Sequence, residues 1–228
     1  DPKCFGGEID TPHLNGLAEK GLRFSQFYNS ARCCPTRASL LTGSYPHRVG
    51  LARNGKTLAN NAPTLAELLK PEGYQTAMTG KWHLSELAAT NDNQDRIRWM
   101  DHQLDLGIPF ADPASYPRAR GFDHYYGVIW GVVDYFDPFS LVHDDTAVKD
   151  VVDSFYLTDS ITDYSVQYIH SFDKHDADPF FLYVAYTAPH WPLHAKPDVI
   201  EKYRGKYDGG WDVLKTSRFQ RQQDMKMF

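Results

Sequence analysis

Cys33 and Cys34 are the residues whose type and position point most clearly to chemistry. Pro35 follows them and has no backbone N–H to lose in a first turn, so it predicts that a helix begins here, with Cys33 just before its amino end. The backbone amides and the dipole at such an end favour an anion. Arg37 adds a guanidinium one turn further on. The pattern therefore indicates an anion-binding site beside Cys33.

A packing role is the alternative for both cysteines, because free cysteines are most often small buried side chains. The chain has 3 cysteines, which do not make a disulfide framework, and two adjacent cysteines cannot pair without straining the backbone. The spacing also lacks the paired pattern of a structural zinc site. From these residues alone, both roles stay open.

Two helix and strand units are predicted around this motif. Pro12 suits a first helical position and Gly21 a helix end, so a helix is expected between them, followed by a strand over about residues 22–29. A second helix is predicted over residues 64–70, where leucines recur on one face, and a strand over residues 74–80 follows it.

The strand over residues 74–80 delivers Lys81 and His83, in the sequence Gly-Lys-Trp-His, at its carboxyl end. A third unit has a helix over about residues 158–169 and, after a break, a strand over residues 180–190 that is rich enough in aromatic and β-branched residues to predict burial on both faces. Alternating helices and strands predict an α/β fold whose largely parallel, mixed central sheet is sandwiched by helices. Ligand-binding groups in such folds gather at the carboxyl ends of the strands.

Residues 85–118 are interpreted as an insertion loop near the site. The stretches ATNDNQD and PFADPASYPRARG are polar and irregular, and a loop of this length inside a compact domain is usually functional or disordered. The 228 residues as a whole are predicted to belong to one domain, because a chain of this length can build a single sizeable core.

The composition excludes several classes of protein. A hydrophobic fraction of 42% with 23% charged residues is enough to bury a core, which argues against disorder. The net charge of -5 and the absence of a basic stripe argue against a nucleic-acid partner. The sequence has no apolar run of about 20 residues and no signal-peptide pattern at its start, so neither a membrane span nor a leader is predicted.

The segment CCPTRASLLTG, residues 33–43, resembles the first signature of the type I, formylglycine-dependent sulfatases, which belong to the alkaline phosphatase superfamily. It matches every defined position of that signature. Residues 73–83 match a second family signature, which ends in Gly-Lys, an aromatic residue and His. The resemblance covers nearly the whole chain, least securely residues 85–118, and implies an alkaline-phosphatase-like fold.

The resemblance implies roles for five residues. A separate formylglycine-generating enzyme would oxidise Cys33 to formylglycine, whose hydrate supplies one oxygen to attack the sulfur of a sulfate ester and a second to expel the sulfate. Arg37 would hold the formylglycine, and Lys81 would contact the sulfate. His83 would orient the diol and act as the base for sulfate release, while His190 would contact the ester side and assist departure of the alcohol.

For several other polar residues, the sequence is compatible with either a role in the site or a structural role. His190 has the alternative role of a hydrogen-bonded structural histidine, and His194 lies either at the substrate rim or in loop packing. Asp134 is expected to reach the substrate pocket, although the adjacent Tyr135 also fits a core position. Residues 143–145, His-Asp-Asp, resemble a metal site superficially, but a solvated loop is the preferred interpretation because a divalent ion needs several converging oxygens.

The resemblance also implies a divalent cation, usually calcium, that polarises the sulfate and is bound by residue 33 as formylglycine. The family's other ligands are an Asp-Asp pair on the first strand and an Asp-Asn or Asp-Gln pair far downstream. The start of this sequence, DPKCFGGEID, matches the segment that follows the first pair. Residues 1–228 are therefore expected to be an interior part of the catalytic domain, truncated at both ends, with the remaining ligands outside it and no activity of its own.

The resemblance implies a sulfuric ester hydrolase that acts on a sulfated small molecule or a sulfated glycan. One alternative is a phosphonate monoester or phosphodiester hydrolase of the same superfamily, which can use the same nucleophile. Another is a non-catalytic fragment in which Cys33 stays unmodified. Because the family is mostly exported or lysosomal, the resemblance implies a periplasmic or secreted enzyme.

Overall fold

The structure, a computed structural model, describes residues 2–173 and 178–227. The chain divides into two compact units, Asn29–His194 and Asp1–Tyr28 with Ala195–Phe228, and each is described by itself. The helices are α1 (Pro12–Lys20), α2 (Cys33–Thr42), α3 (Leu65–Leu69), α4 (Asn93–Met100), α5 (Leu157–Asp173), α6 (Pro197–Glu201) and α7 (Gly210–Asp224). The strands are β1 (Gln75–Gly80), β2 (His124–Val128), β3 (Leu141–His143), β4 (Thr146–Ala147) and β5 (Phe180–Ala185). None of the helices in the described ranges has both the length and the apolar character needed to cross a bilayer.

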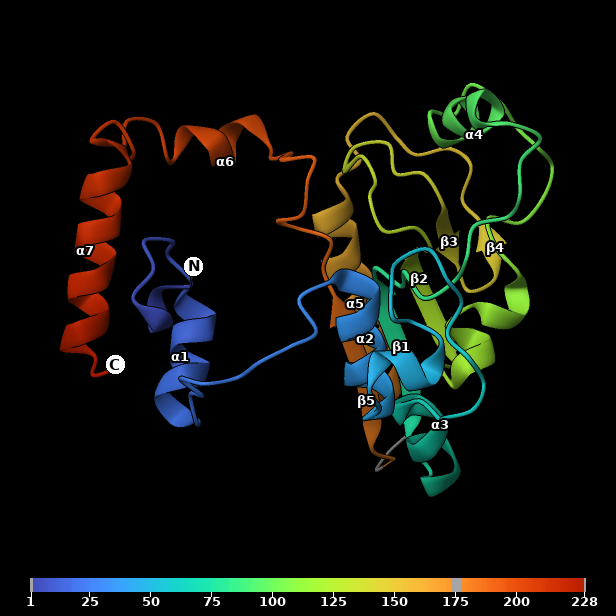
Figure 1. Cartoon of the computed structure of the whole chain (residues 1–228), viewed down its shortest axis with the longest axis horizontal. Coiled ribbons are helices and arrows are strands. Elements are labelled where there is room, and N and C mark those ends of the chain that lie inside the picture. Colours follow the sequence, from blue (N-terminus) through green and yellow to red (C-terminus); the bar gives the residue numbers. More distant parts are fainter. Residues whose placement is uncertain (1, 174–177, 228) are drawn as a thin grey trace. The chain divides into compact units, whose positions relative to one another are not determined.

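The unit Asn29–His194 is built on a five-stranded mixed sheet in the order β4-β3-β2-β1-β5 (Figure 1). β1 pairs in parallel with β2 on one side and with β5 on the other. β3 pairs antiparallel with both β2 and β4. The prediction of an α/β fold with a largely parallel, mixed sheet is therefore confirmed.

Alternate residues of the strands face two separate cores, as the period of two along a strand requires. Met78 of β1 and Tyr125 of β2 belong to the core that includes Cys34 and Ala38 of α2, together with Ala66 of α3. The neighbouring strand residues, Ala77 and Tyr126, belong to the core that includes residues of α5. Helices therefore cover both faces of the sheet.

Three predictions about the elements are wrong in part. No strand follows α1: residues 22–29 have irregular backbone, and their apolar side chains, such as Tyr28 at 87% exposure, are not buried by a sheet. β5 is half exposed rather than buried on both faces, because it is the last strand in the order of the described sheet. α3 buries Ala66, whereas its leucines Leu65 and Leu68 are exposed. The predicted break before β5 includes residues 174–177, which lie outside the described residues.

Residues 85–118 are more ordered than the expected loop. Asp92 caps α4 by accepting the N–H of Asp95 at 2.8 Å, which satisfies a free amide of the first turn. Trp99 of α4 is buried, with Phe110 stacked on it and Phe139 in edge contact. These aromatic contacts fix α4 to the core on the α5 side. The assignment of this segment as an insertion stays a prediction.

The second unit brings residues near the two ends of the described chain together. Glu8 forms an ion pair with Arg218 of α7, at 2.6 Å, and the side chain of Arg221 donates to the carbonyl of Gly6 at 2.9 Å. The hydrogen bond from Arg218 outweighs the effect of burial and lowers the pKa of the Glu8 carboxyl. These contacts tie α7 to the segment that precedes α1.

A buried arginine joins α3 to the loop before β2. Arg120 donates to both carboxylate oxygens of Glu67 and to the carbonyls of Leu58, Ala59 and Ala62. Glu67 also completes a capping box with Thr64, and the Thr64 hydroxyl donates to the carbonyl of Arg120. Burial raises the pKa of the Glu67 carboxyl, but the hydrogen bonds from Arg120 and Thr64 outweigh it and lower the pKa overall.

Arg120→Met in the full-length protein is expected to lower the free energy of unfolding by about 3–5 kcal/mol, because it leaves the Glu67 carboxylate without its buried partner. Arg118→Met is the matched control. The Arg118 side chain is 42% exposed in its pair with Asp145, and exposed pairs contribute about 1 kcal/mol or less. Urea denaturation of both variants checks the prediction, and equal losses would contradict it.

Candidate functional site

Cys33 and Cys34 differ in their surroundings. Cys33 is the first residue of α2 rather than the residue before it, and it is half buried. Cys34 is fully buried, and its N–H donates to Oδ1 of Asn54 at 3.3 Å. Burial raises the pKa of the Cys34 thiol to about 11, so this sulfur stays protonated at neutral pH. Cys33 is therefore the cysteine that can meet a substrate.

Lys81 and His83 lie where β1 runs past the ends of its two neighbours. The N–H of Lys81 donates to the carbonyl of Ala185 at the end of β5, at 2.8 Å, and the N–H of His83 donates to the carbonyl of Ile129, just after β2, at 3.0 Å. Gly80 permits the turn into this segment, because its φ is 91° and a Cβ there would lie 2.1 Å from the Ala185 oxygen. The site residues thus stand at the carboxyl edge of the sheet, as predicted.

Arg37 connects α2 to this edge of the sheet. Its Nη1 donates to the carbonyl of Lys81 at 2.6 Å and to the hydroxyl of Tyr183 at 3.4 Å. The sulfurs of Cys33 and Cys34 and a ring nitrogen of His83 all lie within 4.8 Å of one another. The two signature segments, far apart in sequence, therefore meet at one point.

A cavity of about 640 Å³ opens at this point. Four of the predicted catalytic residues line it, namely Cys33, Arg37, Lys81 and His190. His83 is 4% exposed and does not line the cavity, but its ring lies beside Cys33. The sequence did not single out the other lining residues, which are Asn29, Ala31, Arg32, Thr36, Leu40, Asn54, Tyr183 and Thr187. Cys33 therefore shares one cavity with four cationic or imidazole side chains, those of Arg32, Arg37, Lys81 and His190.

The site is electropositive in a partly desolvated setting. Burial, with the nearby charge of Arg37, lowers the pKa of Lys81 to about 8, so the ammonium is still mostly protonated at pH 7. Burial, together with the charges of Lys81, Arg37 and His190, lowers the pKa of His83 to about 3 and keeps its imidazole neutral. A bound anion would oppose both shifts, because its charge favours the protonated forms. This arrangement suits a tetrahedral oxyanion.

His83 Nδ1 is buried and has no hydrogen-bond partner among the described residues. A buried polar atom without a partner is costly, which makes it a marker of a functional position. A ring nitrogen of His83 lies within 4.8 Å of the Cys33 sulfur, so an oxygen carried by residue 33 would lie close to the imidazole. The surroundings of Cys33 therefore fit the hydroxyl groups of a formylglycine hydrate.

His190 is held by a short loop after β5. Its N–H donates to the carbonyl of Thr187 at 3.0 Å, and its own carbonyl accepts the hydroxyl of Tyr135 at 2.7 Å. Nδ1 lies 2.7 Å from the carbonyl of Trp191, and because a carbonyl only accepts, Nδ1 carries a proton. Tyr135 is 1% exposed, so it supports the loop from the core.

Asp134 and His194 lie together but do not line the cavity around Cys33 in the described structure. Oδ1 of Asp134 accepts the N–H groups of Phe136 and Asp137, which is the pattern of a turn. His194 Nδ1 lies 3.4 Å from the backbone nitrogen of Tyr135 and 3.5 Å from Oδ1 of Asp134. The predicted substrate-binding role of both residues stays a prediction.

The side chain of Trp130 links α4 to His83. The Arg96 guanidinium of α4 lies 5.6 Å from the centre of a Trp130 ring, and Trp130 meets the His83 ring edge-on at 5.3 Å. Residues from the segment 85–118 are therefore one side chain away from the candidate base.

Calcium does not fit the residues gathered here by themselves. Calcium takes six to eight oxygen ligands, and no carboxylate lines this cavity within the described ranges. Cys33, Cys34 and His83 offer sulfur and nitrogen, which suit softer metals. At residues 143–145, Asp144 accepts the N–H of Tyr125 and Asp145 pairs with Arg118, so both carboxylates have protein partners.

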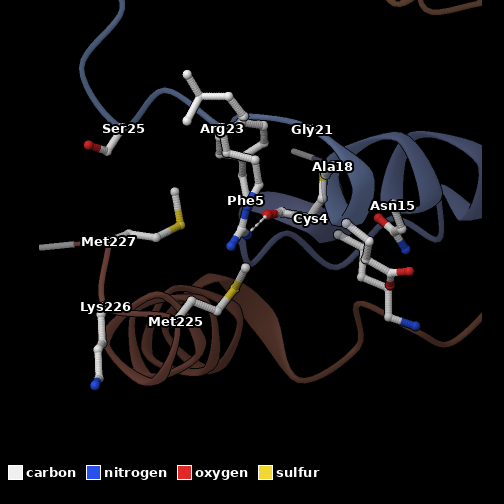
Figure 2. A pocket seen from close by; sticks show the side chains of 13 residues that line it. Cys4, Phe5, Asn15, Ala18, Gly21, Arg23, Ser25, Met225, Lys226 and Met227 are labelled. Carbon is white, nitrogen blue, oxygen red and sulfur yellow. Dashed lines mark hydrogen bonds between the residues drawn. The ribbon is translucent and has the colours of Figure 1, made fainter.

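A second cavity, of about 740 Å³, lies in the unit formed by Asp1–Tyr28 and Ala195–Phe228 (Figure 2). Figure 2 shows Cys4 and Arg23 on one side and the methionines Met225 and Met227 on the other. The Arg23 guanidinium donates to the carbonyl of Cys4 at 2.7 Å. None of its lining residues comes from either signature segment, so the cavity around Cys33 is the candidate site.

Comparisons with known proteins agree on one family. The family model described as Sulfatase matches residues 1–225. An uncharacterized sulfatase of Schizosaccharomyces pombe is 28% identical over 99% of this chain and 42% of its own length. The arylsulfatase of Klebsiella aerogenes is 30% identical over 97% of this chain and 47% of its own length.

Two solved structures resemble this one. The crystal structure of Ps i-CgsB in complex with k-i-k-neocarrahexaose has a TM-score of 0.68 and 27% identity, over 95% of this chain and 48% of that one. The structure of BT4656 in complex with its substrate, D-glucosamine-2-N,6-O-disulfate, has a TM-score of 0.64 and 29% identity, over 88% of this chain and 34% of that one. The chain thus spans less than half the length of these four relatives.

Proposed function

This chain belongs to the sulfatase family, and from that premise we propose that the full-length protein is a sulfuric ester hydrolase that uses a formylglycine derived from Cys33. One observation supports the proposal above all. Cys33, Arg37, Lys81 and His190 line one cavity, with the ring of His83 beside Cys33. Cationic and hydrogen-bonding groups around a nucleophile are what the transfer of a charged sulfuryl group requires.

Each residue has a proposed task in the reaction. When formed, the formylglycine hydrate supplies the attacking oxygen and the oxygen that later expels the sulfate. Lys81 binds a sulfate oxygen, and Arg37, fixed by the Lys81 carbonyl, holds residue 33 and offsets its negative charge. His83, neutral at pH 7, accepts a proton at its ring during sulfate release.

His190 is proposed to act on the leaving group. Its backbone is fixed on both sides, by the Thr187 carbonyl and the Tyr135 hydroxyl, so its ring is held at the cavity wall. A protonated imidazole there would donate to the ester oxygen as the alcohol departs. The deep burial of Tyr135 makes this loop rigid enough to position a proton donor.

The proposed cofactors are a formylglycine and a divalent cation, on which the family generally depends. For the cation we propose calcium, with residue 33 as one ligand. The other oxygen ligands would come from outside the residues that line this cavity, because those residues do not make a calcium site alone. A formylglycine-generating enzyme is the proposed partner during maturation.

The proposed substrate is a sulfated glycan or a sulfated small molecule. Support comes from the two similar structures, which are complexes with k-i-k-neocarrahexaose and with D-glucosamine-2-N,6-O-disulfate. The net charge of -5 argues that any long polyanion must bind through the electropositive cleft rather than through the surface as a whole. A periplasmic or secreted location is proposed on the family resemblance.

Side-by-side rates on an aryl sulfate and on a phosphonate monoester test the reaction class. The full-length protein, produced in a host that forms formylglycine and supplied with calcium, is expected to have a higher kcat/KM for the sulfate. Both substrates are tetrahedral oxyanions, so the comparison isolates the reacting group. A strong preference for the phosphonate would overturn the proposed function in favour of the phosphonate hydrolases of the same superfamily.

A further inference from the structure

The imidazole of His83 fills the space that a side chain at position 131 would need. A Cβ added to Gly131 would lie 2.0 Å from Cε1 of the His83 ring and 2.3 Å from both ring nitrogens. These separations are far inside van der Waals contact, so one of the two groups must move. The contact is with the ring itself rather than with a flexible chain end.

The backbone near Gly131 has little freedom to withdraw from the ring. Ile129 accepts the N–H of His83 at 3.0 Å and donates its own N–H to the carbonyl of Ser140 at 3.1 Å. The N–H of Trp130 donates to the Ser140 hydroxyl at 2.9 Å. Because these bonds hold Ile129 through both its N–H and its carbonyl and Trp130 through its N–H, a methyl group at position 131 is expected to displace the imidazole.

A second contact restricts the ring further. Trp130 meets the His83 ring edge-on, at a centroid distance of 5.3 Å and an interplanar angle of 70°. The His83 backbone is also constrained, with φ at 57° in the left-handed region. The imidazole therefore has one well-defined seat, between Trp130 and the bare backbone of Gly131, with a ring nitrogen near Cys33.

We propose that Gly131 is a positioning residue of the active site, whose lack of a side chain creates the seat that holds the His83 imidazole against residue 33. The seat follows from the geometry alone. Its catalytic consequence rests on the proposed function, in which His83 is the base for sulfate release. The local sequence around residue 131 does not predict this role.

Gly131→Ala in the full-length protein is expected to lower kcat for an aryl sulfate about 100-fold, at the low end of what a positioned acid or base contributes. KM is expected to change much less, because Lys81 and Arg37 still bind the sulfate. The φ of Gly131 lies outside the left-handed region, so alanine adds a methyl group without backbone strain. Gly16→Ala is the control, since a Cβ there meets nothing within 4 Å, and it should leave kcat unchanged.

A double-mutant cycle separates positioning from general damage. His83→Ala empties the seat, so adding Gly131→Ala to it should cost no further activity and should not lower the urea midpoint further. In the protein that retains His83, by contrast, Gly131→Ala should lower both kcat and the midpoint of urea denaturation. If Gly131→Ala alone does not fold, the cycle still decides, because the double variant is expected to fold as well as His83→Ala.

The outcomes distinguish this inference from the proposed function. Equal losses in the two backgrounds, or a wild-type kcat in Gly131→Ala, would overturn the positioning role. The positioning role would be supported if Gly131→Ala lowered kcat and the urea midpoint only in the protein that retains His83. If the wild-type protein cleaves no sulfate ester but the midpoints are coupled, the seat is supported and the proposed function is wrong.

Discussion

Cys33→Ala in the full-length protein is expected to lower sulfate ester hydrolysis by about 10⁴- to 10⁶-fold, which is the range for loss of a catalytic nucleophile. Alanine cannot be converted to formylglycine, so it supplies no oxygen to attack the sulfur. The remaining electropositive groups, Arg37 and Lys81, would still bind the sulfate. The loss should therefore appear in kcat and much less in KM. Steady-state rates on an aryl sulfate provide the measurement.

Cys34→Ala is the matched control for this prediction. Cys34 is fully buried among apolar residues, and its thiol is protonated at neutral pH. Its replacement should reduce stability by about 1 kcal/mol, a typical cost for a point substitution, and leave most of the activity. If Cys34→Ala abolished hydrolysis while Cys33→Ala kept it, the assignment of the nucleophile to position 33 would be wrong.

Lys81→Met is the substitution with the second largest expected effect. The Lys81 residue is 2% exposed, and its ammonium lies near Arg37, which makes the charge costly in the empty site. The negative charge of a bound sulfate would offset this cost. Removal of the ammonium should therefore lower kcat by about 10²- to 10³-fold, as for loss of one oxyanion-stabilising donor. The hydrogen bond from Arg37 to the residue 81 carbonyl involves the backbone and is retained.

Lys81→Met is expected to lose activity without losing stability. Because methionine buries no charge, Lys81→Met should be at least as stable to urea as the wild-type protein. Lys56→Met, at an exposed ion pair with Glu86, is the control and should change neither rate nor stability appreciably. A destabilised Lys81→Met that retains the wild-type rate would show that Lys81 is structural.

The sequence predicted the parts of the site that depend on short segments. Pro35 predicted that a helix begins at this motif, with Arg37 about one turn inside it, and α2 begins there, one residue earlier than expected, at Cys33. Lys81 and His83 follow the strand that was predicted over residues 74–80, and the carboxyl ends of parallel strands meet at one edge of a sheet. Burial of Cys34 also agreed with the ordinary behaviour of free cysteines.

Features that depend on packing between distant segments could not be predicted from the sequence. The seat of His83 requires Gly131, which is distant along the chain and has no local signal of its own. The exposure of β5 depends on its place in the sheet order, which a single apolar run does not reveal. Trp99, in a segment that was interpreted as loop, is buried because Phe110 and Phe139 close around it.

The central claim, that Cys33 becomes the catalytic formylglycine, is tested most directly by peptide mass spectrometry of an active preparation. The peptide that contains residues 33 and 34 should have lost one sulfur and two hydrogens and gained one oxygen, with fragment ions placing the change at residue 33. An intact thiol at Cys33 in protein that cleaves sulfate esters, or the same change at Cys34, would contradict the account.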